Sequence, residues 1–174
     1  MDTTTAGQLT LIRAITAALS HAGVPYWLFG GWAVDFVVGA CTRPHDDVEF
    51  VVWKHDLPRL RALFEAHGCR PAFTHEDAAG WWSDDTLVEL YVVERDDQRQ
   101  IVTPGPWKDW PWPAASFTAP PGRLDDVVCP LVRAEVQLRT KEGYRHHPSG
   151  APPRPKDLAD IAHLRRAIAE RSAG

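Results

Sequence analysis

Acidic side chains interrupt two stretches of the sequence that otherwise have the pattern of buried β-strands. Asp47 comes directly before the stretch 48–53, Glu49 lies within it, and Glu89 is the lone acid of the stretch 87–93. Side chains alternate along a strand, so Asp47 and Glu49 share one face. Two carboxylates on one face repel each other unless cations lie between them, and Mg²⁺ prefers oxygen ligands of this kind. The spacing therefore favours a metal-binding pair at Asp47 and Glu49.

Glu89 has two functional interpretations and one structural interpretation. It could be a third metal ligand from a neighbouring strand, or a general base for a substrate hydroxyl if its surroundings adjust its pKa. It could equally be an outward-facing strand residue, although Leu87 and Tyr91 on the same face are apolar. For Asp47 and Glu49 the structural alternative is a solvated edge strand, against which their apolar neighbours argue.

A Gly30-Gly31 pair precedes these acids and suits phosphate chemistry. It joins a predicted strand over 26–29 to a predicted helix over 32–38. Without Cβ atoms the backbone can approach a phosphate, and the first amides of a helix point toward it. A Gly-Gly turn alone is more often structural. Its place in the order strand, turn, helix, loop, acidic strand is what indicates a nucleotide site.

The elements that position these residues follow from the hydrophobic pattern. Apolar residues at helical spacing predict further helices over 3–22, 57–67, 131–144 and 156–171. Strand patterns occur over 26–29, 48–53, 70–73 and 87–93, with a last edge strand over 126–129. Residues 94–121 predict loop with short strand pieces. The pattern favours an α/β (α+β) fold, with a core over 1–125 and a helical C-terminal part over 126–174, which can also form one continuous domain.

Composition limits the class of protein. The 174 residues suit one domain, and 19 Lys+Arg against 23 Asp+Glu give a net charge of −4, which argues against a general nucleic-acid binder. The three cysteines are widely spaced and indicate neither a zinc site nor a disulfide framework, so we expect a reduced cytoplasmic setting. We expect no signal peptide and no membrane-spanning segment.

The segment 27–53 carries GGWAVDFVVG followed by TRPHDDVEF. It resembles the antibiotic nucleotidyltransferases of the polymerase-β-like superfamily, in particular the lincosamide and aminoglycoside 2''-nucleotidyltransferases, whose pattern is GGW, a short helix and T-R-x-H-x-D-x-D. Weaker similarities lie at Glu89, at CPLVRAEVQLRTKEGY and at RPKDLADIAHL. The resemblance implies a nucleotidyltransferase-type mixed sheet flanked by helices.

The resemblance also implies a reaction. An NMP, with AMP expected first, would pass from ATP or another NTP to a hydroxyl of a small molecule, with a lincosamide or an aminoglycoside antibiotic as the expected acceptor. One or two Mg²⁺ ions would be held by the three catalytic acids, Asp47, Glu49 and Glu89. The residues implied in nucleotide binding are Gly30, Gly31, Trp32, Arg43, His45 and Lys156.

The sequence departs from the family pattern at two of the acids. Glu49 stands where most such enzymes have Asp, and Glu89 where Asp is frequent. The longer side chain moves the carboxylate outward, and Mg²⁺ tolerates misplaced ligands poorly. A non-catalytic nucleotide-binding or small-molecule-binding relative is therefore the alternative. A nucleotidyltransferase acting on protein or tRNA is a weaker one, because the chain lacks a basic excess. The sequence leaves the oligomeric state open.

Two further groups bear on the acceptor. One is rich in Trp and allows either a wall for the face of a sugar or an aromatic core beneath long loops: Trp81, Trp82, Trp107, Trp110 and Trp112. The other is Asp84 and Asp85, which would suit the ammonium groups of an aminoglycoside but better fit a solvated turn.

Overall fold

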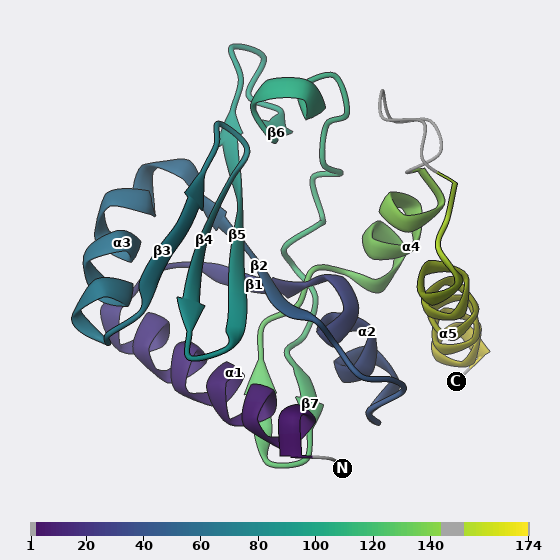
Figure 1. Cartoon of the computed structure of the whole chain (residues 1–174). Coiled ribbons are helices and arrows are strands. Elements are labelled where there is room, and N and C mark those ends of the chain that lie inside the picture. The colour runs from purple at the N-terminus through teal and green to yellow at the C-terminus, as the bar shows by residue number, and fades with distance from the viewer. Residues whose placement is uncertain (1–2, 144–151, 174) are drawn as a thin grey trace.

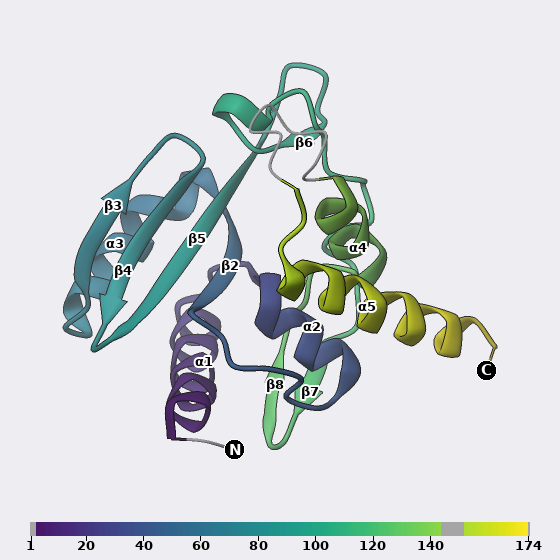
Figure 2. The same cartoon turned by 45° about the vertical axis from the view of Figure 1, so that its right-hand side comes forward.

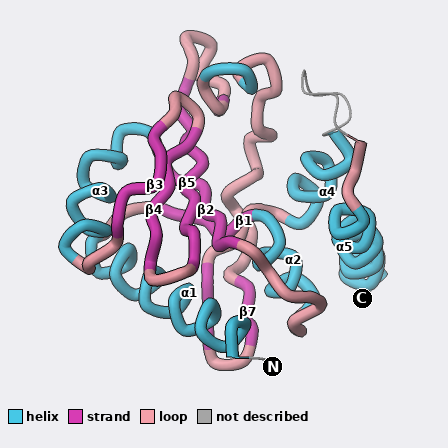
Figure 3. The backbone as a smooth tube through the Cα atoms, in the orientation of Figure 1, coloured by secondary structure: helices cyan, strands magenta, loops and turns pink. Residues whose placement is uncertain are grey.

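The computed structural model describes residues 3–143 and 152–173. The helices of this part are α1 (Thr3–Ala22), α2 (Gly30–Val38), α3 (Leu57–Ala66), α4 (Ala134–Gly143) and α5 (Pro155–Ala173), with short 3-10 turns η1 (Lys54–Asp56) and η2 (Gly105–Trp107). The strands are β1 (Tyr26–Phe29), β2 (Asp47–Trp53), β3 (Arg70–Thr74), β4 (Ala78–Ser83), β5 (Thr86–Arg95), β6 (Ile101–Val102), β7 (Gly122–Leu124) and β8 (Val127–Cys129). Figure 3 distinguishes the helices, strands and loops of the chain by colour.

The main sheet is mixed, as the resemblance implies. Its strand order is β1-β2-β5-β4-β3, and β6 pairs with the end of β5. Strands β2 and β5 run parallel, whereas the other pairs are antiparallel. The parallel register places Glu49 opposite Glu89 and Asp47 opposite Leu87. The acids of two sequence segments forty residues apart thus meet at one pair of strands.

Helices cover the sheet from two sides. Figures 1 and 2 show α1 and α3 on one side and α2, α4 and α5 gathered beside the β1–β2 end. Alternate residues of β2 and β5, such as Phe50 and Leu90, are fully buried in the larger core with the apolar side chains of α1 and α3. The opposite face holds a smaller core, formed by Phe29, Val51 and Val136 among others. The acids occupy this second face because alternation puts Glu49 on the same side as Val51.

Most predicted elements are present, with informative differences. The helix after β1 begins at Gly30, so both glycines belong to its first turn. Strand β4 was not predicted, because its sequence AAGWWS consists mainly of small and bulky residues without a strand-like alternation. The strand expected over 126–129 exists as β8 but pairs with β7 in a separate hairpin. The predicted helix over 131–144 begins only at Ala134, and its expected end at residue 144 lies outside the described residues.

The C-terminal elements share the large core. Leu131 pairs with Leu28 of β1, and Leu164 of α5 is fully buried. The expected division between 1–125 and 126–174 stays a prediction. No disulfide joins the three cysteines, all of which belong to the described part of the chain, and no helix of that part is both long and apolar enough to cross a bilayer.

Candidate active site

Three carboxylates lie on the second face of the sheet. Burial, together with the negative charges of Asp47 and Glu89, raises the pKa of Glu49 to about 7, and the cation of Lys141 opposes this shift. Burial also raises the pKa of Glu89, and Asp47 adds to this effect, while the Tyr91 hydroxyl lowers it by donating to Glu89 Oε2 at 3.1 Å. The structure therefore places the three acids on neighbouring strands, near enough for their charges to interact. Such mutual repulsion is the expected signature of a site that takes cations. Among the described residues, the group whose ligand atoms all lie within 4.8 Å of one another is a different one, Asp35, Cys41 and His45, so a shared metal site at the three acids stays a prediction.

The two glycines make room for this cluster. Gly30 has φ of 65°, and a Cβ at this position would overlap the Glu49 carboxylate. The Gly31 N–H donates to Glu49 and helps to keep it ionised. A Cβ on Gly31 would overlap the side chains of Arg43 and His45. The space that a Cβ of Gly30 would fill is thus taken by the Glu49 carboxylate, a side chain of the site itself.

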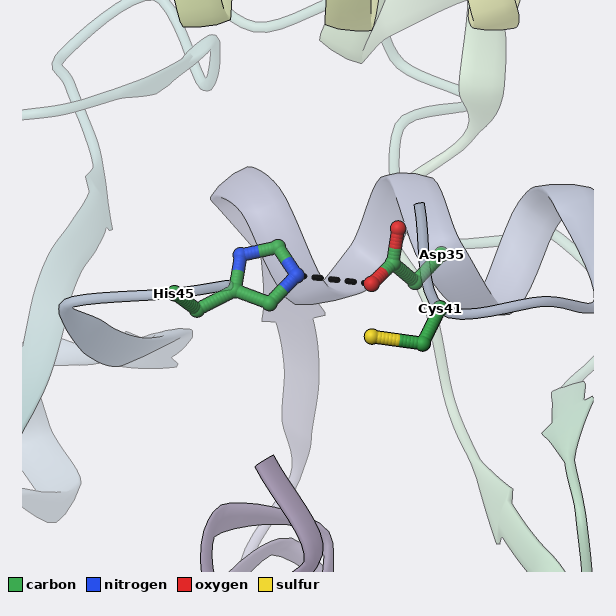
Figure 4. A group of neighbouring side chains, drawn as sticks. All are labelled: Asp35, Cys41 and His45. Atoms are coloured by element: carbon green, nitrogen blue, oxygen red, sulfur yellow. Dashed lines mark hydrogen bonds and ion pairs between the residues drawn. The ribbon is translucent and has the colours of Figure 1, made fainter. Parts of the chain in front are cut away.

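A hydrogen-bonded group of Asp35, Thr42 and His45, here called the brace, fixes the loop that leads into β2 (Figure 4). His45 Nε2–H donates to Asp35 Oδ2 at 2.7 Å, and Asp35 Oδ1 accepts from the Thr42 amide at 3.1 Å and the Thr42 hydroxyl at 2.5 Å. Cys41 lies beside this pair, with its Sγ within 4.8 Å of the Asp35 and His45 ligand atoms, and its thiol donates to the Arg43 carbonyl. Hydrogen bonds account for both Asp35 oxygens. The brace holds the loop at a set distance from α2.

Two residues implied in nucleotide binding belong to the interior side of this brace. The Trp32 ring lies 4.6 Å from the His45 ring, and only 1% and 7% of these residues are exposed. Trp32 Nε1 donates to Gln8 Oε1 at 3.2 Å, and Gln8 Nε2 donates to the His45 carbonyl at 3.1 Å. The positions of Trp32 and His45 suit support of the loop rather than direct contact with a ligand.

Arg43 ties the same loop to the C-terminal helix. Its guanidinium makes two hydrogen bonds to Asp160 of α5, at 3.1 and 3.0 Å. Lys141 of α4 lies 2.8 Å from Asp160 and 3.9 Å from Asp157. Burial alone raises the pKa of Asp160, but Arg43 and Lys141 outweigh burial and hold it below its ordinary value. Asp160 of α5 thus connects α4, through Lys141, and the loop, through Arg43.

Lys141 is the site residue that sequence reasoning missed. It is 6% exposed, and its charge stabilises the Glu49 carboxylate. Helical spacing gives a signal for it, because Lys141 falls on the same face as the buried Ala134 and Gln137. A lysine on the buried face of a helix calls for a carboxylate partner, and here it has several.

Lys156, the last residue implied in nucleotide binding, lies at the outer edge of the loop. Its Nζ is 2.7 Å from Asp46 Oδ2, directly before Asp47 in the chain. The hydrogen bond and the charge of Lys156 lower the pKa of Asp46. Asp46 is largely exposed, so this pair is open to solvent and to ligands.

An aromatic hollow adjoins the acids on the same face of the sheet. It encloses about 610 Å³, open solvent included. Its lining residues are mostly aromatic or apolar: Phe29, Tyr91, Thr103, Trp107, Trp110, Pro111, Trp112, Pro113, Val136, Arg139, Thr140 and Gly143.

The Trp-rich stretch is therefore divided between two roles. Trp107, Trp110 and Trp112 line the hollow. Trp81 is buried in the larger core, stacked on Phe64 with ring centroids 5.1 Å apart, and Trp82 is exposed. Asp84 and Asp85 form the exposed turn between β4 and β5, as a solvated turn requires.

Sequence comparison identifies relatives of the chain. A profile of the family described as aminoglycoside-2''-adenylyltransferase matches residues 11–164. Proteins described as 2''-aminoglycoside nucleotidyltransferases from Escherichia coli and Klebsiella pneumoniae are 41% identical over 70 residues, which cover 40% of this chain and 38% of each relative. The matched segment thus spans well under half the length of these curated relatives.

Solved structures share the fold. A crystal structure of ANT(2'')-Ia in complex with adenylyl-2''-tobramycin has a TM-score of 0.76 at 22% identity, covering 95% of this chain and 92% of that chain. The lincomycin-bound lincosamide antibiotic adenylyltransferase LnuA has a TM-score of 0.68 at 20% identity, covering 88% of this chain and 94% of that chain. Similarity at this level of identity establishes the fold.

Gly30→Ala should disrupt the acid cluster, because the new Cβ displaces the Glu49 carboxylate in addition to straining a left-handed backbone. Gly39→Ala is the matched control, since Gly39 has φ of 80° and no atom lies within 4 Å of the place that its Cβ would take. The left-handed conformation should cost both variants about 1 kcal/mol in urea denaturation. Only Gly30→Ala should also weaken Mn²⁺ binding, measured by electron paramagnetic resonance. Equal Mn²⁺ binding by both variants would show that Gly30 does not shape the site.

Asp160→Asn should lower the free energy of unfolding by about 3 kcal/mol at pH 7, because it leaves Lys141 and the partly exposed Arg43 without their carboxylate. Asp160 has a lowered folded-state pKa, so its contribution is present above its unfolded pKa of about 4 and is lost as pH falls through the folded value. The difference between wild type and variant in urea denaturation should therefore shrink below pH 4.

Arg166→Ala on the same helix removes only an exposed pair with Glu170 and serves as the control, with an unchanged unfolding midpoint expected. A difference for Asp160→Asn that stays constant from pH 7 to pH 2 would contradict the assignment.

Proposed function

The chain belongs to the aminoglycoside-2''-adenylyltransferase family, and from that membership we propose that it transfers a nucleotidyl group from an NTP, with ATP as the expected donor, to a hydroxyl of a small molecule of the antibiotic type. The observation that carries the proposal is the register of β2 with β5, which sets Glu49 opposite Glu89 with Asp47 on the same face. The similarity to antibiotic adenylyltransferase structures supports the same conclusion.

The acid cluster suits a divalent cation. The charge of Asp47 raises the pKa of both Glu49 and Glu89, and the three carboxylates form a donor set of hard oxygen ligands, which is the set that Mg²⁺ takes. Asp47 and Glu49 would hold the ion, with Glu89 beside them. When bound, Mg²⁺ would neutralise charge on the phosphates and favour ionisation of the attacking hydroxyl. The extra length of Glu49 is accommodated by packing against Gly30, which has no Cβ.

The remaining steps use the chain's own groups. Glu89 accepts the proton of the acceptor hydroxyl, whose oxygen forms a bond to the α-phosphorus while the bond to the departing pyrophosphate breaks. Its raised pKa brings Glu89 nearer to the working pH of a general base, and the Tyr91 hydroxyl fixes its orientation. Lys141 favours the ionised form of Glu49, and Lys156, at the open edge of the loop, would bind phosphate.

One observation favours the alternative of a non-catalytic binding protein. The Gly31 amide, which the resemblance assigns to phosphate, donates to Glu49 instead. A protein that binds nucleotide without transferring it would show NTP binding by calorimetry that does not depend on Mg²⁺, and no release of pyrophosphate with any acceptor.

Asp47→Asn should abolish transfer while the fold survives. Loss of one preorganised charged group at a reacting centre costs about 10²–10³-fold in rate, and loss of a metal ligand should cost at least as much. The measurement is pyrophosphate release with Mg²⁺, each NTP, and a panel of lincosamides and aminoglycosides, with mass spectrometry of the products. Asp85→Asn in the exposed β4–β5 turn is the matched control and should retain wild-type rates. Full activity of Asp47→Asn would contradict the metal assignment.

A further inference from the structure

The walls of the aromatic hollow are fixed in place by specific contacts. Trp112 Nε1 donates to Thr103 Oγ1 at 2.9 Å, and the Trp112 amide donates to the Ile101 carbonyl at 2.8 Å. The Trp110 ring lies so close to Gly143 of α4 that a Cβ there would overlap it. A hollow whose rings are held by the backbone and by hydrogen bonds is preformed, as small-molecule sites usually are.

The hollow opens beside the reacting groups. Tyr91 both lines it and donates to Glu89 Oε2 at 3.1 Å. Phe29 also lines it and pairs in register with Glu49 across β1 and β2. The Phe29 and Tyr91 rings are 5.8 Å apart, edge to face. A molecule resting on these two rings would therefore lie next to Glu89.

The lining of the hollow itself carries a positive charge, which does not favour a polyamine. Among the described residues that line it, Arg139 is the one charged side chain, and none is a carboxylate. Arg139 lies 5.4 Å from the centroid of the Trp110 ring and donates to the Pro111 carbonyl at 2.9 Å. It thereby occupies one face of the Trp110 ring, on which a ligand ammonium could otherwise make a cation–π contact, and it repels further positive charge.

We infer that this hollow is the acceptor subsite and that it takes a molecule with at most one positive charge and an apolar face beside its reactive hydroxyl, rather than a polycationic aminoglycoside. Aromatic rings suit the apolar face of such a molecule, and apolar lining with few polar groups is typical of small-molecule sites. The inference rests on the proposed nucleotidyl transfer and narrows its acceptor toward compounds of the lincosamide kind, although the family description names aminoglycosides.

Binding without nucleotide separates this inference from the reaction. Lincomycin, with one basic amine, and tobramycin, with several, are titrated by calorimetry into the wild-type chain in the absence of NTP and divalent metal. Lincomycin should bind at least about tenfold more tightly, as expected when a fixed cation faces a ligand of several positive charges. Tighter binding of tobramycin, or no measurable binding of either compound, would overturn the inference.

Variants that change the charge at Arg139 test whether this residue causes the preference for lincomycin over tobramycin. Arg139→Glu should reduce the preference for lincomycin at least about tenfold, mainly by strengthening tobramycin binding, and Arg139→Gln should fall between it and wild type. Arg166→Glu is the matched control for net charge, because Arg166 is exposed on α5 and does not line the hollow. A preference unchanged by Arg139→Glu would show that the ligand binds elsewhere.

Pyrophosphate release with ATP, Mg²⁺ and each compound is then measured on the same proteins. Tobramycin turnover faster than lincomycin turnover would overturn the inference and leave the proposed transfer intact. Selective lincomycin binding without turnover of either compound would support the ligand preference inferred for the hollow and would contradict the proposed transfer.

Discussion

Repulsion among three carboxylates is the constraint on which the site depends. The parallel pairing of β2 with β5 places Glu49 opposite Glu89, and alternation adds Asp47 to the same face. Burial and mutual repulsion bring the pKa of Glu49 to about 7. The cluster is tolerated because opposing groups surround it: the Gly31 amide and the Lys141 cation favour the ionised form of Glu49, and the Tyr91 hydroxyl favours that of Glu89. A divalent cation would relieve the same repulsion.

The surrounding structure keeps this face of the sheet in shape. The loop before β2 is held to α2 by the Asp35–His45 hydrogen bond and to α5 by the Arg43–Asp160 pair. Asp160 also holds Lys141, so the cation that faces Glu49 is anchored by the same carboxylate that anchors the loop. Removal of a single acid on α5 therefore affects both sides of the site, which explains why residues far apart in the sequence act together.

The sequence carried enough information to predict the acids but less to predict their supports. Strand alternation predicted one shared face for Asp47 and Glu49, and the apolar context singled out Glu89, because these are local patterns. The parallel register that joins them is a long-range property, and no local pattern determines it. Strand β4 was missed because AAGWWS lacks alternation, and its place in the sheet comes from pairing with β5.

Side-chain roles in the loop were also set by tertiary packing. Trp32 and His45 were expected at the nucleotide, but the structure places both in the interior against Gln8 of α1, a residue distant in sequence. For Lys141 the only indication in the sequence was a charged residue on the face of a predicted helix that is otherwise buried. The Trp-rich stretch was one candidate for the wall of a ligand site, and Trp107, Trp110 and Trp112 do line the hollow. The rest of its lining could not be predicted, because it comes from β1, β5 and α4, which are distant in the sequence.

Anomalous scattering from crystals grown with Mn²⁺ and a non-hydrolysable ATP analogue tests most directly whether the three carboxylates form one metal site. A Mn²⁺ peak should lie within coordination distance of Asp47 and Glu49, at about 2.0–2.2 Å from their oxygens as for a hard divalent cation, with the analogue's phosphates on the same ion. Absence of a peak at this cluster, or a peak only at the Asp35, Cys41 and His45 group, would contradict the assignment.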